Sequence, residues 1–166
     1  MFKNLIVTLC LVVATLGDIS IAYADEESVK KDIINVALEN GSLNTFSEAL
    51  STADLAGTLK GQGPFTVFAP TDKAFAALPQ DTLKVLLQPE NREKLIEIIN
   101  FHLVADKLTG NDMVKATHFK SVQGQILTVS TEGGRVMINN AGVTMIDVEA
   151  SNGVIHLIDT VLLPKE

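Results

Sequence analysis

The spacing of apolar residues changes near His102, and this change restricts the fold classes open to the chain. Before that point apolar residues recur three or four positions apart, as in Ile33, Val36 and Ala37, which is the spacing of one helix face. After it, segments such as 143–148 are rich in β-branched residues and are separated by turn residues. Helices first and strands afterwards indicate an α+β fold with mainly antiparallel strands, and not an alternating β-α-β chain.

The first part of the chain is predicted to hold most of the helices. Ser28 is a candidate N-cap of a helix that stops near Gly41, and a second helix is expected from Ser42. The β-prone run 65–69 lies between two prolines and predicts a buried strand. Further helices are expected at 55–59, 72–78, 82–87 and 91–100.

The second part predicts four strands joined by tight turns. The strands are expected at 122–131, 135–140, 143–148 and 154–163, with turns at 132–134, 140–142 and 152–153. Asn152-Gly153 is a strong turn signal because both residue types tolerate positive φ. Segment 105–120 lacks a clear pattern and is expected to be a loop with a short helix that starts at Thr109.

The first 24 residues have the features of a secretory signal peptide. Lys3 precedes an uncharged apolar run over 5–16, and Ala22-Tyr23-Ala24 supplies the small residues that a cleavage site needs. We therefore expect cleavage before Asp25, export to the periplasm, the medium or the cell surface, and a bacterial source. Residues 25–166 would then form a single domain, with no membrane span in the mature chain.

Two other interpretations of the leader are less favoured. A membrane anchor needs about 18 or more apolar residues, whereas Asp18 interrupts this run. A lipid-attachment cysteine needs a small residue before it, whereas Leu9 precedes Cys10. Removing the leader would leave 142 of the 166 residues, without Cys, Tyr or Trp. Stability must then come from packing, since one chain has no disulfide.

Three segments together resemble the fasciclin domain family. Residues 63–75 (GPFTVFAPTDKAF) are similar to its first box, and residues 151–164 (SNGVIHLIDTVLLP) are similar to its second. Between them, 100–104 is similar to a central Tyr-His motif, with Phe101 in place of the Tyr. Their order and separation fit over residues 28–164. The resemblance implies a wedge of antiparallel-rich β-strands packed with several α-helices, in an exported or cell-surface protein.

The box residues are interpreted as structural. Thr71 and Asp72 stand at a helix start, where a cap contributes about 1 kcal/mol. Asp159 lies inside a predicted apolar strand, where a buried carboxylate must accept hydrogen bonds or pair with a charge. The box residues expected to serve the fold are Phe68, Pro70, Thr71, Asp72, Phe75, Asn152, Gly153, His156 and Asp159.

Phe101 and His102 occupy the position of the family's interaction motif, which in some animal members is tied to integrin binding. Because Phe101 lacks the phenol hydroxyl, integrin recognition is not carried over to this chain. A packed, hydrogen-bonded core histidine is the favoured interpretation of His102. His118 and His156 are interpreted as surface or half-buried residues.

The sequence favours binding over catalysis. It contains no Gly-x-Ser-x-Gly elbow, no His-Glu-x-x-His and no phosphate-binding glycine loop, and its three histidines lack the short spacing of a zinc site. No cofactor or metal is expected, and the net charge of -7 argues against nucleic acid. The family acts chiefly in adhesion, so the resemblance implies a non-catalytic interaction module with an unknown surface, matrix or protein partner. Since a few family members bind carotenoids, the alternative is a soluble carrier of an apolar small molecule such as a carotenoid.

Overall fold

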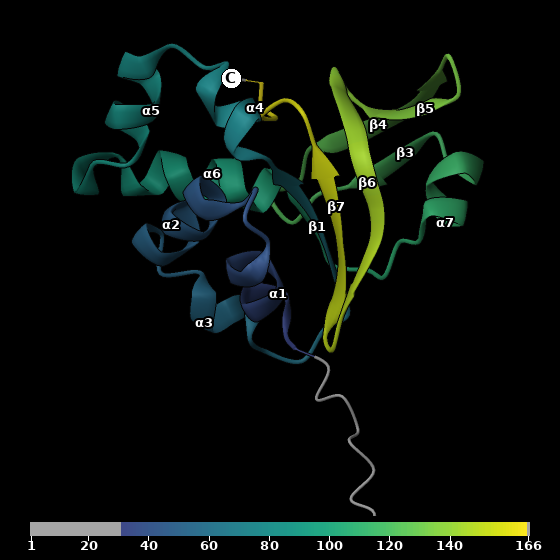
Figure 1. The fold of residues 1–166 in the computed structure, drawn as a ribbon, viewed down its shortest axis with the longest axis horizontal. Coiled ribbons are helices and arrows are strands. Elements are labelled where there is room, and N and C mark those ends of the chain that lie inside the picture. Colours follow the sequence, from purple (N-terminus) through teal and green to yellow (C-terminus); the bar gives the residue numbers. More distant parts are fainter. Residues whose placement is uncertain (1–30, 166) are drawn as a thin grey trace, which may run out of the picture.

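The computed structural model describes residues 31–165 (Figure 1). The predicted leader, its cleavage site and the Ser28 cap lie outside these residues. The helices are α1 (Ile33–Glu39), α2 (Asn44–Thr52), α3 (Ala56–Leu59), α4 (Asp72–Ala76), α5 (Gln80–Leu86), α6 (Arg92–Phe101) and α7 (Gly110–Lys115), with a 3-10 turn at Pro89–Asn91. The strands are β1 (Phe65–Pro70), β2 (Leu103–Val104), β3 (His118–Lys120), β4 (Ile126–Glu132), β5 (Arg135–Ile138), β6 (Ala141–Ala150) and β7 (Gly153–Ile158).

The strands form one seven-stranded sheet in the order β2-β1-β7-β6-β5-β4-β3. All neighbouring strands are antiparallel except β1 and β7, which pair in parallel from Phe65 opposite Gly153 to Pro70 opposite Ile158. The α+β class and the antiparallel-rich strands are confirmed. The parallel pair was not predicted, and it places β7 beside β1, the only strand before His102 among the residues that the structure describes.

Strands β1 and β7 separate two hydrophobic cores. In Figure 1, helices α1 to α6 lie on one side of these strands, and β3, β4, β5 and α7 lie on the other. Because side chains alternate along a strand, Val67 and Ile155 join the helical core, whereas Phe68 and Ile158 join the second core. Every residue of β7 is therefore buried, which explains its nearly continuous apolar sequence.

Several predicted boundaries were wrong. Helix α1 begins at Ile33, and Asp32 caps it by accepting a hydrogen bond from the backbone N–H of Asn35. The last strand ends at Ile158 instead of residue 163, because its partner β1 turns into α4 after Pro70. The turn expected at 140–142 lies at Asn139 and Asn140, and Asn139 has the positive φ of 55°.

Other predicted boundaries shifted by a few residues, while the helix expected at Thr109 is confirmed. Strand β4 starts four residues later than the expected strand at 122, and β6 is longer at both ends than the expected 143–148. Thr109 and Asp112 form a reciprocal capping box at the start of α7. The Thr109 cap thus marks a helix start inside a segment without apolar periodicity.

Gly153 is required for a reason other than the one predicted from sequence. The turn consists of Ser151 and Asn152, and neither Asn152 nor Gly153 is among the residues with positive φ. Gly153 belongs to β7, and a Cβ atom there would lie 1.9 Å from the backbone oxygen of Phe65. The missing side chain therefore lets β1 and β7 approach at the start of their pairing.

Replacing Gly153→Ala should destabilise the protein by at least about 3 kcal/mol, since the clash is with backbone and β1 must move away. Gly57→Ala is the matched control, because its added Cβ in α3 meets nothing within 4 Å. That change should be neutral or stabilise by up to about 1 kcal/mol. Urea unfolding followed by circular dichroism measures both, and equal midpoints for Gly153→Ala and the native chain would contradict this role.

Candidate functional site

The structure brings the two family-box segments together along the parallel strand pair. Phe68 of β1 lies opposite His156 of β7, and their rings stack with centroids 5.6 Å apart and planes 27° from parallel. Both side chains are fully buried. The boxes are therefore two halves of one packed centre, and this contact follows from the parallel pairing alone.

Thr71 and Asp72 cap two different helices. The Thr71 hydroxyl accepts from the backbone N–H of Ala74 at 3.4 Å and caps α4 as predicted. The Asp72 carboxylate instead accepts from the backbone N–H of Thr45 at 2.8 Å and the Asn44 amide at 3.0 Å, at the start of α2. Partial burial acts to raise the pKa of Asp72, but the hydrogen bonds from Thr45 and Asn44 outweigh it and lower that pKa. Asp72 thus joins α4 to α2.

Asn152 connects the β6–β7 turn to two helices of the other half. Its Oδ1 accepts from the backbone N–H of Ile33 at 3.0 Å, at the start of α1. Its Nδ2 donates to the carbonyl oxygens of Leu59, at the end of α3, and Gly61. An asparagine is needed because one side chain must both accept and donate. In addition to its predicted role in the turn, Asn152 therefore connects the β6–β7 turn to α1 and α3.

His156 is buried, contrary to the surface or half-buried position predicted for it. Its Nε2 donates to the carbonyl of Leu108 at 2.8 Å, and its Nδ1 accepts from the backbone N–H of Asp147 at 3.2 Å. The ring is thus a neutral imidazole that joins β7 to the 105–109 loop and to β6. Burial lowers the pKa of His156, although the Leu108 hydrogen bond and the nearby Asp147 charge act to raise it.

Thr66 binds the same loop as His156, and the sequence did not predict this role. Its side chain is fully buried on β1, where its hydroxyl donates to the carbonyl of Asp106 at 2.6 Å and accepts from the N–H of Leu108 at 2.9 Å. A hydroxyl within an otherwise apolar strand was the available signal. Together, Thr66 and His156 satisfy the backbone of a loop that would otherwise have no partners in the interior.

His102 is the packed, hydrogen-bonded core histidine that the sequence favoured. It is 1% exposed. Its Nδ1 donates to the carbonyl of Ile98 at 2.7 Å, and its Nε2 accepts from the N–H of Leu162 at 3.0 Å. Burial lowers its pKa to about 4, against a smaller opposing effect of the Ile98 hydrogen bond. The ring therefore stays neutral and holds the C-terminal segment against the end of α6.

The neighbouring Phe101 lies in the second core and is 3% exposed. Consecutive residues at the end of α6 thus face different cores, with His102 beside the helical core and Phe101 against β-strands. A partner can therefore reach very little of this motif, since Phe101 is 3% and His102 1% exposed.

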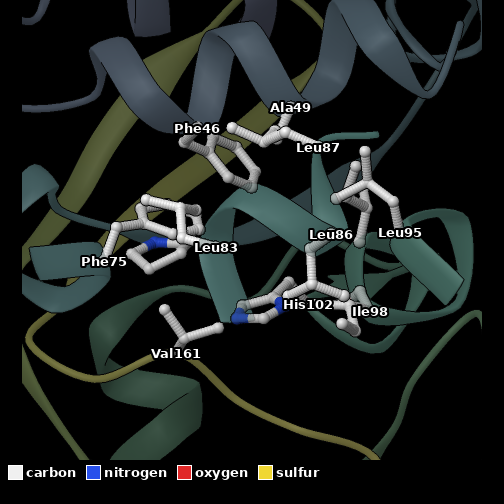
Figure 2. A pocket seen from close by; sticks show the side chains of 12 residues that line it. Phe46, Ala49, Phe75, Leu83, Leu86, Leu87, Leu95, Ile98, His102 and Val161 are labelled. Carbon is white, nitrogen blue, oxygen red and sulfur yellow. Dashed lines mark hydrogen bonds between the residues drawn. The ribbon is translucent and has the colours of Figure 1, made fainter. Parts of the chain in front are cut away.

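An apolar seam runs between α5 and the helical core beside His102. Figure 2 shows Phe46, Phe75, Leu83 and Leu86 among the side chains that line this seam. Its internal volume is about 10 Å³, which is room for about one water molecule. The seam in this conformation therefore has no space for a carotenoid.

Asp159 lies just beyond β7, and its side chain is 41% exposed, so the prediction of a carboxylate inside a strand was wrong. It accepts from the backbone N–H of Gly142 at 2.8 Å and lies 3.6 Å from the Arg135 guanidinium. A Cβ at residue 142 would come within 2.8 Å of the same carboxylate. Asp159 thus ties the end of β7 to Gly142 of β6 and Arg135 of β5.

The polar groups of this centre are already engaged with the protein itself. Within residues 31–165, every buried side-chain nitrogen and oxygen has a hydrogen-bond partner. The same residues contain no group of three or more His, Cys, Asp or Glu side chains placed to hold a metal ion. The arrangement can hold segments of the chain in place, and its buried side chains have little remaining capacity for a ligand.

Comparisons with known proteins agree with the predicted resemblance. The fasciclin domain profile matches residues 41–164. Protein sll1483 of Synechocystis sp. is 42% identical over 162 residues, 90% of this chain and 89% of that protein. Cell surface glycolipoprotein MPB83 of Mycobacterium bovis is 35% identical over 137 residues, 80% of this chain and 60% of the relative. A FAS1 domain pair from the insect cell adhesion molecule fasciclin I superposes with a TM-score of 0.59 at 25% identity, covering 75% of this chain and 46% of that one.

The two buried histidines should make folding sensitive to acid. In the folded chain burial lowers the pKa of His102 from 6.5 to about 4, and lowers that of His156 as well. The unfolded chain therefore binds protons at a higher pH than the folded chain. Stability is complete above pH about 6.5 and decreases as the pH falls toward 4, with His102 alone removing about 3 kcal/mol.

Urea unfolding at pH 7, 6, 5 and 4 tests this, with circular dichroism as the signal because Trp is absent and the one Tyr, Tyr23, belongs to the predicted leader. The midpoint should fall over this range, before most carboxylates titrate. His102→Gln should reduce the slope, whereas His118→Gln, at an exposed position, should leave it unchanged. An unchanged midpoint between pH 6.5 and 4 in the native chain would contradict the neutral, buried state of His102.

Proposed function

The chain belongs to the fasciclin domain family, and from this premise we propose that it is an exported, non-catalytic interaction module that attaches its cell to a surface, a matrix or a partner protein. Relatives support the adhesive role by name, since one is a cell surface glycolipoprotein and another a cell adhesion molecule. No enzyme family is indicated by these matches. We further propose that residues 1–24 direct export and are removed before Asp25.

The observation that carries this proposal is the inward orientation of the polar motif residues. Asn152, His102 and His156 all direct their hydrogen-bonding atoms to the backbone of the same chain. A reaction site would need polar groups open to a substrate, whereas an attachment module needs only a rigid scaffold and an outer surface. None of the helices within residues 31–165 is long and apolar enough to cross a membrane.

The carrier of an apolar small molecule gains no support from the seam beneath α5. A carotenoid would require a cavity of several hundred cubic ångströms, as drug-sized ligands do, whereas the seam holds about 10 Å³. The seam therefore gives the carrier no geometric support, whereas the inward-facing polar side chains suit an attachment module.

Deleting the gene should reduce attachment of the native cells to their surface several-fold, measured as retained cells under flow. The full-length gene should restore attachment. A gene encoding the chain without residues 2–24 should not, because its product stays inside the cell. Normal attachment by the deletion strain would contradict the function, and rescue by the shortened gene would contradict export through the leader.

A further inference from the structure

The residues that follow β7 cross the fold without forming a helix or a strand. We call residues 159–165 the C-terminal segment. Its Val161 side chain packs in the helical core and its Leu162 side chain in the second core, and both are buried. Leu163, the next residue, is 51% exposed. Apolar packing by two adjacent side chains therefore holds the middle of this segment.

His102 supplies the hydrogen bond that fixes the same place. The N–H of Leu162 donates to its Nε2 at 3.0 Å. The other hydrogen bonds to neighbouring elements lie at the ends of the C-terminal segment, where Asp159 is bonded to β6 and Lys165 to Gln125. Among residues 31–165, the His102 ring is thus the one polar group that holds the middle of the segment to another element.

The His102 ring can accept this hydrogen bond only while it is neutral. Its Nδ1 donates a proton to the carbonyl of Ile98, so Nε2 has the lone pair that accepts from Leu162. A second proton would occupy that lone pair and place an N–H opposite the N–H of Leu162. The hydrogen bond would be lost, and a charged ring would lie among apolar side chains.

No charged side chain is placed to stabilise a protonated His102 ring. The side chains that line the seam with it come from α2, β1, α4, α5, α6 and Val161, and all of them are apolar (Figure 2). The charged side chains of the C-terminal segment, Asp159 and Lys165, stand at its ends. Burial lowers the pKa of His102 to about 4, and no charged group contributes to this shift.

We propose that His102 is a pH-sensitive switch, whose protonation releases the C-terminal segment from both cores while β1 and β7 remain paired. In the released state the charged ring reaches water, and Val161 and Leu162 join Leu163 in an exposed apolar strip. Acid shifts the equilibrium because a proton binds the released state more tightly than the closed state. The inference goes beyond the proposed function, since the switch operates whatever partner the module binds.

The two pKa values of the ring give the size of the shift. A hydrated histidine has a pKa of 6.5, whereas the pKa of the buried His102 is about 4. The ratio of released to closed chains should therefore increase about 20-fold between pH 7 and 5, and about 100-fold between pH 7 and 4. Above pH about 7 the ratio should be constant, because the ring is neutral in both states.

The other buried histidine acts on different segments. His156 is bonded to the carbonyl of Leu108 and to the N–H of Asp147, and neither bond reaches the C-terminal segment. Its protonation would loosen the 105–109 loop and β6. The backbone amide of Asp147 therefore reports on His156, whereas the amide of Leu162 reports on His102.

Amide hydrogen exchange of the isotope-labelled native chain, followed by NMR between pH 7 and 4, tests the switch. After correction for the intrinsic exchange rate at each pH, the opening constant of the Leu162 amide should increase by the factors given above. The amides of 67–69 should stay more protected at every pH. Equal opening constants for residue 162 and for 67–69, or a change below about threefold at residue 162 between pH 7 and 5, would overturn the proposal.

Two variants separate His102 from the carboxylate of the same segment. His102→Gln places an oxygen that does not titrate near the position of Nε2, so the Leu162 opening constant should lose most of its pH dependence. Asp159→Asn is the matched control, because it removes a carboxylate but keeps an oxygen for Gly142, and it should keep the native pH dependence. The reverse pattern would contradict the role of His102.

A direct titration of the native chain decides the question if His102→Gln does not fold. The ring signals of His102 should titrate below about pH 5, in step with shifts of the amide signals of residues 161–163. A ring that titrates without shifts of these amides, or that titrates near pH 6.5, would overturn the proposal.

Discussion

The parallel pairing of β1 with β7 is the interaction on which the rest of the structure depends. It joins the strand of the helical part to the last strand of the chain, from Phe65 opposite Gly153 to Pro70 opposite Ile158. Both cores form on this pair, one on each face. Contacts between distant parts of a chain cost loop-closure entropy, so they must be reinforced by further interactions. The family boxes provide that reinforcement.

Polar side chains on and around this strand pair bind backbone groups of distant segments. Asn152 joins the β6–β7 turn to α1 and α3, whereas Thr66 and His156 hold the 105–109 loop. His102 holds the C-terminal segment. An unpaired buried amide or carbonyl costs about 1–3 kcal/mol, so these side chains are strongly constrained without taking part in chemistry. Under the proposed function, partner binding is therefore assigned to the outer surface.

The sequence predicted the α+β class, the Thr109 helix and a packed His102 because these depend on local signals: apolar spacing, a capping box and an apolar helix end. It did not predict the β1–β7 pairing, because no local pattern states which distant strand is a partner. The wrong predictions for His156 and Asp159 have the same cause, because both depend on which distant segments pack against β7. Alternation along β7 could not show that both of its faces are covered, nor that the strand ends where β1 turns away.

The central claim is that β1 and β7 form the most stable part of the fold, and amide hydrogen exchange under native conditions tests it most directly. The backbone amides of 67–69 and 155–157 should exchange last, with a free energy of opening equal to that of global unfolding by urea. The amides of β4 and β5 should exchange at lower or equal free energies. Exchange of β1 and β7 through a partial opening, while β4 and β5 remain protected, would contradict the account.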